Sequence, residues 1–226
     1  MQDALEHALA AISGAPIRVT AAGRTDRGVH ARAQVVHFDT DAVRPGSAWV
    51  RGVNALLPDS VAVLWSREVD AQFHARYSAT ARTYRYELLN RPVRPALAAS
   101  RVGWFHLPLD LGKMREAAAV LVGEHDFSAF RSSECQAKTP VRMLHALHIE
   151  RNGERIDFAL RANAFLHHMV RNIVGTLVYV GKGKHPPAWV GEVLASRDRS
   201  RAAPTFGPEG LVLEKIEYEA KWGLPL

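Results

Sequence analysis

The chain has 226 residues, 47% of them hydrophobic, which is enough for one large domain or two small ones with a real core. Its formal charge of +6 favours a polyanionic partner, nucleic acid first, although many enzymes are mildly basic. A single cysteine, Cys135, excludes an internal disulfide framework and any multi-cysteine metal site, and it fits a reducing compartment.

Arginine makes up most of the basic residues, with 23 arginines and 6 lysines among the 29. A guanidinium grips phosphate through two parallel hydrogen bonds and stacks on bases, which again suits RNA, although genomic base composition would produce the same excess. No apolar run is long enough to span a bilayer, and the N-terminus has no secretory signal. These features predict a cytoplasmic protein without membrane attachment.

Residues 1–78 predict a first α/β part with the order helix, strand, strand, helix, strand. Leu5, Leu9 and Ile12 recur at helical spacing, and residues 29–38 alternate between apolar and polar. The predicted elements are a helix over 2–12, strands over 17–21 and 29–38, a helix over 47–57 and a strand over 61–69. The first two strands predict a hairpin with Asp26 at its tip.

Residues 79–226 predict a second α/β part. Its clearest signal is the Asn152-Gly153 pair between two alternating runs, which is typical of a tight hairpin. The predicted elements are a strand over 82–88, a helix over 110–122, strands over 141–150 and 156–162, helices over 165–180 and 187–195, and a strand over 211–218. This order contains a split β-α-β-β-α-β arrangement.

The first part repeats the order of the second but lacks the opening strand, whose place is the middle of such a sheet. We therefore predict an α+β fold of two pseudo-repeated ferredoxin-like halves, with antiparallel-rich sheets flanking a basic cleft. An unfilled central slot leaves buried backbone groups unpaired, each at a cost of about 1–3 kcal/mol. We expect marginal stability unless another segment fills it.

The motif GRTDRGVH at 23–30 places Asp26 between Arg24 and Arg27 in a glycine-bounded turn. Nearby arginine lowers the pKa of an aspartate, and an ionised carboxylate suits nucleophilic or electrostatic work at a sugar carbon. The arginines could grip phosphates of the same substrate. An aspartate in such a turn more commonly bonds its own backbone, so chemistry alone favours a structural role.

The run GRTDRGVHARAQVVHF resembles the signature of the tRNA pseudouridine synthase A family. Further motifs follow in the same order over nearly the whole chain: GVNALLP, FHARYSATARTYRYELLN, EHDFSAF, CQAKTPVR and FLHHMVRNIVG. Family members usually begin with a strand carrying a Tyr-Asp-Gly motif, and that strand is absent here. The resemblance implies a pseudouridine synthase fold and isomerisation of uridine to pseudouridine at positions 38, 39 and 40 of the tRNA anticodon arm. It also implies a homodimer without cofactor or metal.

The resemblance assigns three catalytic residues. Asp26 matches the aspartate that attacks the target nucleotide, and Arg171 matches the basic residue that pairs with it, so the two should lie within salt-bridge distance. Tyr84 matches the active-site tyrosine, which can stack on an extruded base and take part in proton transfer. From the residues alone, Tyr84 is a core tyrosine, since it shares a strand face with Tyr86, and Arg171 is a solvated arginine at a helix edge.

Other residues are weaker candidates. Arg24 is the first choice for a phosphate contact, followed by Arg27, Arg82 and Arg131. The adjacent residues His167 and His168 should diverge on a helix, and no carboxylate or cysteine has a ligand spacing with them, so no metal site is predicted. Cys135 lies in a family-like motif but receives no chemistry.

Two other functions stay open at this point. The first is a non-catalytic tRNA-binding or folding module, which the absent strand favours. The second is an enzyme of the same fold that acts on other RNA. An acidic residue at the centre of a basic cleft argues against binding alone, because binding a polyanion has no need for it.

Overall fold

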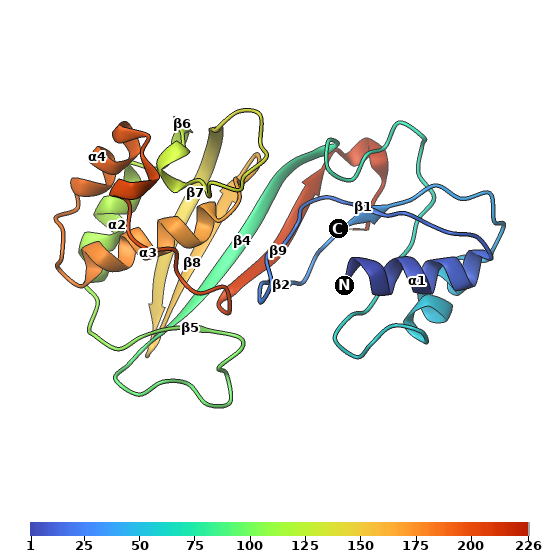
Figure 1. Ribbon diagram of the computed structural model, residues 1–226, viewed down its shortest axis with the longest axis horizontal. Coiled ribbons are helices and arrows are strands. Elements are labelled where there is room, and N and C mark those ends of the chain that lie inside the picture. The colour runs from blue at the N-terminus through green and yellow to red at the C-terminus, as the bar shows by residue number, and fades with distance from the viewer. Residues whose placement is uncertain (226) are drawn as a thin grey trace. The chain divides into compact units, whose positions relative to one another are not determined.

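A computed structural model describes residues 1–225 (Figure 1), and packing divides the chain into two compact units. Unit 1 comprises Met1–Arg24, Gln34–Thr80 and the C-terminal segment from Glu217. Unit 2 comprises Thr25–Ala33 and Ala81–Ile216. The division therefore follows packing rather than chain order.

The two units differ from the predicted halves 1–78 and 79–226 at two segments. Residues 25–33, which carry Asp26, pack with unit 2, and the C-terminal segment packs with unit 1. The chain passes between units near residue 80, close to the predicted boundary.

Unit 1 contains α1 (Gln2–Ser13) and a two-stranded antiparallel sheet of β1 (Thr20–Ala21) and β3 (Val36–His37). α1 ends at Gly14, whose φ of 84° is the left-handed conformation that glycine adopts without strain. A π-helical turn covers Ala48–Gly52, and a 3₁₀ turn covers Ala220–Trp222. The core of the unit comprises Ala8, Leu9, Ile17, Val19 and Val53.

One prediction for this part of the chain is wrong, and another holds only in part. No strand forms over 61–69. The side-chain amide of Asn54 donates a hydrogen bond to the Val63 carbonyl at 2.8 Å and accepts one from the Val63 N–H at 2.7 Å, so the backbone of Val63 pairs with a side chain and not with a neighbouring strand. The predicted antiparallel pairing across Asp26 forms in part, because β1 pairs with β3. The connection between them is longer than a tight hairpin turn, and within it β2 (His30–Ala31) pairs in parallel with a strand of unit 2.

Unit 2 is built on a seven-stranded mixed sheet with the order β2-β9-β4-β8-β7-β6, and β5 lies beside β4. Its other strands are β4 (Ala79–Asn90), β5 (Gly103–Phe105), β6 (Gly123–Asp126), β7 (Val141–Asn152), β8 (Arg155–Ala162) and β9 (Leu211–Tyr218). The predicted hairpin around Asn152-Gly153 and the last strand are confirmed, and β5 and β6 were not predicted. The predicted combination of helices with a multi-stranded sheet is confirmed for this unit.

The helices of unit 2 are α2 (Leu111–Ala119), α3 (Met169–Gly181) and α4 (Trp189–Ser196), with 3₁₀ turns over Ser128–Phe130 and Arg199–Arg201. They gather beside β7 and β8 (Figure 1), and α2 contacts β7, α3 and α4. Alternate residues of β8 are fully buried, as the period of a strand with one core face requires. Among residues 1–225, no helix combines the length and the apolar character needed to cross a bilayer.

Candidate active site

The Asp26 loop, residues 25–33, is held within unit 2 by a tight turn and by the strand that follows it. The Val29 N–H donates to the Asp26 carbonyl at 3.1 Å, which closes a tight turn, and β2 follows at once and pairs with β9. Gly28 in this turn has a φ of 84°, and a Cβ atom there would lie 3.0 Å from Cγ of Pro208. Only glycine therefore fits without strain, and the loop presents Asp26 from a fixed backbone.

We expect Gly28→Ala to destabilise the protein by about 1–3 kcal/mol, because alanine must adopt a left-handed conformation against Pro208. The displaced carboxylate should also lower the rate of product formation at least about tenfold. Thermal melting and single-turnover kinetics would measure both effects. Gly153→Ala is the matched control, because Gly153 has a φ of 59° and open space around it; it should lose stability but keep its activity.

Asp26 and Arg171 form the predicted ion pair. Nη1 of Arg171 donates to Oδ2 of Asp26 at 2.8 Å, and Nε of the same guanidinium donates to the Phe206 carbonyl at 2.8 Å. The two side chains are only 20% and 13% exposed, so water screens their attraction incompletely. Two contacts fix the guanidinium, and the guanidinium in turn fixes one carboxylate oxygen.

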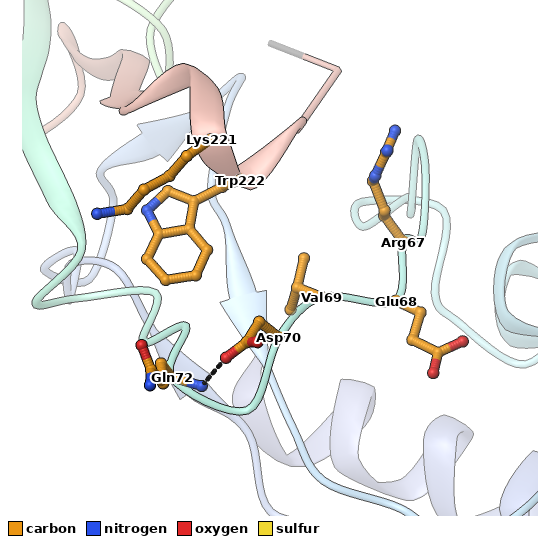
Figure 2. Close-up of a pocket in the computed structure, with 7 residues that line it drawn as sticks. All are labelled: Arg67, Glu68, Val69, Asp70, Gln72, Lys221 and Trp222. Carbon is orange, nitrogen blue, oxygen red and sulfur yellow. Dashed lines mark hydrogen bonds between the residues drawn. The ribbon is translucent and has the colours of Figure 1, made fainter.

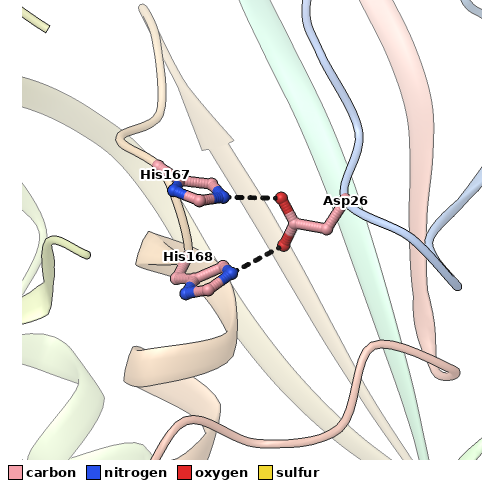
Figure 3. A group of neighbouring side chains, drawn as sticks. All are labelled: Asp26, His167 and His168. Atoms are coloured by element: carbon pink, nitrogen blue, oxygen red, sulfur yellow. Dashed lines mark ion pairs between the residues drawn. The ribbon is translucent and has the colours of Figure 1, made fainter. Parts of the chain in front are cut away.

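His167 and His168 also converge on Asp26 (Figure 3). Nε2 of His167 lies 3.1 Å from Oδ1, and Nε2 of His168 lies 3.3 Å from Oδ2. The prediction that these rings diverge is wrong. α3 begins only at Met169, and His168 has a φ of 63°, so the two residues precede the helix and their rings lie 4.0 Å apart.

Burial lowers the pKa of His168, although the Asp26 carboxylate opposes this shift, and the neighbouring His167 and Arg171 lower it further. The lowered pKa favours the uncharged imidazole, whose Nε2 lies 3.3 Å from Oδ2 of the carboxylate. The sequence offered no signal for this contact beyond two adjacent histidines, because their carboxylate partner lies far away along the chain.

The donor atoms of Asp26, His167 and His168 all lie within 4.8 Å of one another, so these residues could hold a metal ion. A guanidinium 2.8 Å from Oδ2 disfavours a cation at the same carboxylate. Spacing along the chain gave no sign of this group, because Asp26 lies far from the histidines in the sequence. The absence of a metal stays a prediction.

Tyr84 on β4 lies in the same region as Asp26. Burial raises the pKa of Tyr84 to about 12, and the negative charge of Asp26 adds to this effect. Its ring packs edge-on against Phe165, with ring centroids 5.0 Å apart. Tyr84 thus meets both interpretations of the sequence: it packs on the core, and its phenol, protonated at neutral pH, lies within the field of the carboxylate.

The four predicted phosphate-binding arginines occupy different settings. Arg24 and Arg27 are exposed, and Arg24 belongs to unit 1 whereas Arg27 belongs to unit 2. Nη1 of Arg82 donates to the Asn163 carbonyl at 2.8 Å. Nη2 of Arg131 donates to two carbonyls of its own loop, those of Cys135 and Ala137. Their contact with a substrate stays a prediction.

A separate pocket of about 400 Å³ lies in unit 1 (Figure 2). Side chains of the segment 67–72 and the C-terminal residues Lys221 and Trp222 line it, and the Gln72 N–H donates to Asp70 at 2.7 Å. None of the predicted site residues lines this pocket. The candidate active site therefore lies in unit 2 and comprises Asp26, Tyr84, His167, His168 and Arg171, here named the Asp26 cluster.

The chain belongs to the tRNA pseudouridine synthase family, because a family model of that description matches residues 1–78 and 117–219. Similar proteins named tRNA pseudouridine synthase A include one from Thiobacillus denitrificans, 60% identical over 225 residues, which are 100% of this chain and 86% of the relative. Those of Methylobacillus flagellatus and Aromatoleum aromaticum are 57% and 59% identical over 225 residues, with 86% and 85% of the relatives covered. The predicted resemblance is confirmed.

Proposed function

We propose that this protein isomerises uridine to pseudouridine in tRNA, with Asp26 as the nucleophile. One observation carries the proposal: a carboxylate on a fixed turn is paired at 2.8 Å with a largely buried arginine and lies near a protonated tyrosine. Family membership supports the reaction class. A surface ion pair with a purely structural role would not need three further side chains, those of His167, His168 and Tyr84, around its carboxylate.

In the proposed reaction, Asp26 attacks the ribose carbon that bears the base, and the C–N bond breaks with its electron pair on N1 of uracil. The free base turns, and its C5 forms the new C–C bond as the carboxylate leaves. The proton lost from C5 balances the proton gained at N1. Neither an electron nor an external group enters, so the step needs no redox cofactor.

Arg171 and the two histidines would position Asp26 for this step. The guanidinium holds Oδ2 of the carboxylate at 2.8 Å, and the imidazole Nε2 atoms at 3.1 and 3.3 Å restrict the rotation of the carboxylate. Because these groups are in place before substrate binds, less reorganisation is needed during the reaction. His167 and His168 are positioning residues in this proposal.

Tyr84→Phe tests the role of the hydroxyl. A phenol with a pKa of about 12 stays protonated at assay pH, so it can donate a proton or hydrogen bond but cannot act as a base. We expect the variant to lose activity about 10–100-fold while its melting temperature stays the same, because the ring still packs on Phe165. Tyr179→Phe, on α3, is the control. Full activity of Tyr84→Phe would restrict Tyr84 to packing or stacking.

The proposed substrate is the anticodon arm of tRNA, with uridines 38, 39 and 40 as targets. The target lies within folded RNA, so the enzyme should recognise shape and backbone and then flip the base out. Arg24, Arg27, Arg82 and Arg131 would contact phosphates, and binding should weaken with salt. The same proposal includes a fold of two pseudo-repeated ferredoxin-like halves that flank a basic cleft. It also includes a cytoplasmic homodimer in which one subunit grips the body of the tRNA.

The direct test is pseudouridine formation by this chain on an unmodified tRNA with uridines in its anticodon arm. Product mapped to positions 38–40 would support the whole proposal, and product elsewhere would favour action on another RNA site. A folded protein that binds tRNA but forms no pseudouridine would favour the non-catalytic module.

Removal of metal ions should leave the rate unchanged. The proposed chemistry uses only a carboxylate, an arginine and a phenol, so protein stripped with EDTA and assayed with prefolded tRNA should keep its activity within about twofold. The measurement is a progress curve before and after stripping. A loss that Zn²⁺ restores would instead place a metal ion at Asp26, His167 and His168.

A further inference from the structure

A second pocket, of about 640 Å³, borders the Asp26 cluster within unit 2. His168 lines it and also lies 3.3 Å from Asp26, so one side chain belongs to both places. The polar side chains that line it include those of Ser128, Arg131, Ser132, His168, Arg199 and Thr205. Three arginines line the pocket against one carboxylate, that of Asp198, and no Phe, Tyr or Trp lines it.

Arg199 is partly buried without a counter-ion. Its Nη2 donates to Oδ1 of Asn172 at 3.1 Å and to Oγ1 of Thr205 at 3.0 Å, and Asn172 is itself fully buried. Burial lowers the pKa of Arg199, and within residues 1–225 no carboxylate oxygen lies within 4.0 Å of its guanidinium. A half-buried cation held by neutral groups favours an anion that enters from solvent.

The neighbouring Asp198 does not supply this anion. Its Oδ1 accepts hydrogen bonds from the N–H and the hydroxyl of Ser200, both at 2.8 Å. These bonds hold the pKa of Asp198 below its usual range and turn the carboxylate toward its own turn. Nε of Arg197 lies 3.4 Å from Oδ2 of Asp126, so Arg131 and Arg199 are the two lining arginines that supply the excess positive charge of the pocket.

Arg131 lines the same pocket. Its Nη2 donates to the carbonyls of Cys135 and Ala137, and the guanidinium also interacts with the Cys135 side chain, whose pKa it helps to lower. No carboxylate of residues 1–225 forms an ion pair with Arg131, so its positive charge is available to the pocket that it lines. The hydroxyls of Ser128 and Ser132 add donors to the lining of the pocket.

We infer that this pocket binds a backbone phosphodiester of a nucleotide next to the target uridine. The inference rests on the proposed function for RNA as the substrate. Guanidinium edges and hydroxyls match the oxygens of a phosphate, and the absence of Phe, Tyr and Trp removes the usual platform for a base. Because His168 contacts both the pocket and Asp26, an RNA phosphate bound in the pocket would lie close to Asp26.

The test replaces single phosphodiesters of an anticodon stem-loop RNA by uncharged methylphosphonates and measures binding to the whole protein. At one position beside the modified uridine, the replacement should weaken binding to the wild-type protein about tenfold. In Arg131→Gln the same replacement should have no further effect. The salt slope of this variant should fall by about 0.7, as expected for one lost single-strand contact.

Two controls keep the result interpretable. Arg155→Gln, whose arginine pairs with Glu87 outside the pocket, should retain the wild-type response to every methylphosphonate. Ser132→Ala leaves the hydrogen bonds of Arg131 in place. In this variant the same methylphosphonate should weaken binding somewhat less than it does in the wild-type protein.

If the wild-type protein forms pseudouridine but no methylphosphonate effect disappears in Arg131→Gln, the pocket proposal is wrong and the proposed function stands. If the wild-type protein fails to bind tRNA at every salt concentration tested, both proposals are wrong. If the methylphosphonate effect changes equally in Arg131→Gln and Arg155→Gln, the pocket proposal is also wrong, because the effect would then come from the overall charge of the protein.

Discussion

We expect Asp26→Asn to reduce pseudouridine formation by at least about a thousandfold, because a neutral amide cannot serve as the nucleophile. Asparagine has nearly the same shape, and its side-chain oxygen can still accept the hydrogen bond from Arg171. The fold and the affinity for tRNA should therefore change little. Single-turnover product formation and a tRNA-binding isotherm would measure the two properties separately.

Asp157→Asn is the matched control for this variant. Asp157 also accepts a hydrogen bond from an arginine of unit 2, Arg85, and its side chain is 26% exposed against 20% for Asp26. It should keep full activity. Activity of Asp26→Asn close to the wild-type value would exclude Asp26 as the nucleophile, and loss of tRNA binding would indicate a role in recognition.

The second large effect is expected for Arg171→Met, which leaves the Asp26 carboxylate largely buried without its cation. Removal of one partner of a buried ion pair costs about 3–5 kcal/mol, and the residual exposure of both side chains here should bring the loss to about 2–3 kcal/mol. Product formation should fall at least about a hundredfold, because Asp26 loses its orientation. Urea denaturation and single-turnover kinetics would measure these losses.

Arg155→Met is the corresponding surface control. Arg155 pairs with Glu87, but its side chain is 55% exposed, so the loss should stay below about 1 kcal/mol. Arg171→Lys keeps the charge but cannot hold both Asp26 and the Phe206 carbonyl with one planar group, and we expect intermediate stability and activity. An Arg171→Met protein as stable and active as the wild type would contradict the proposed role of the pair.

The parts of the fold that the sequence predicted well are those whose partners are close along the chain. The hairpin around Asn152-Gly153 is one example: its turn signal and its alternation are local, and β7 and β8 form there. β9 was also predicted with its observed bounds. The strand expected over 61–69 failed because a side chain, that of Asn54, satisfies the backbone in place of a strand.

Sequence motifs and periodicity were enough to predict the family, the combination of helices with a sheet, and the ion pair of Asp26 with Arg171. The approach of both histidines to Asp26 depends on the folded chain, because the left-handed backbone at His168 places the two residues before the start of α3. The folded chain also places the Asp26 segment in unit 2, through the parallel pairing of β2 with β9. Such contacts join residues far apart along the chain, and local periodicity carries no information about them.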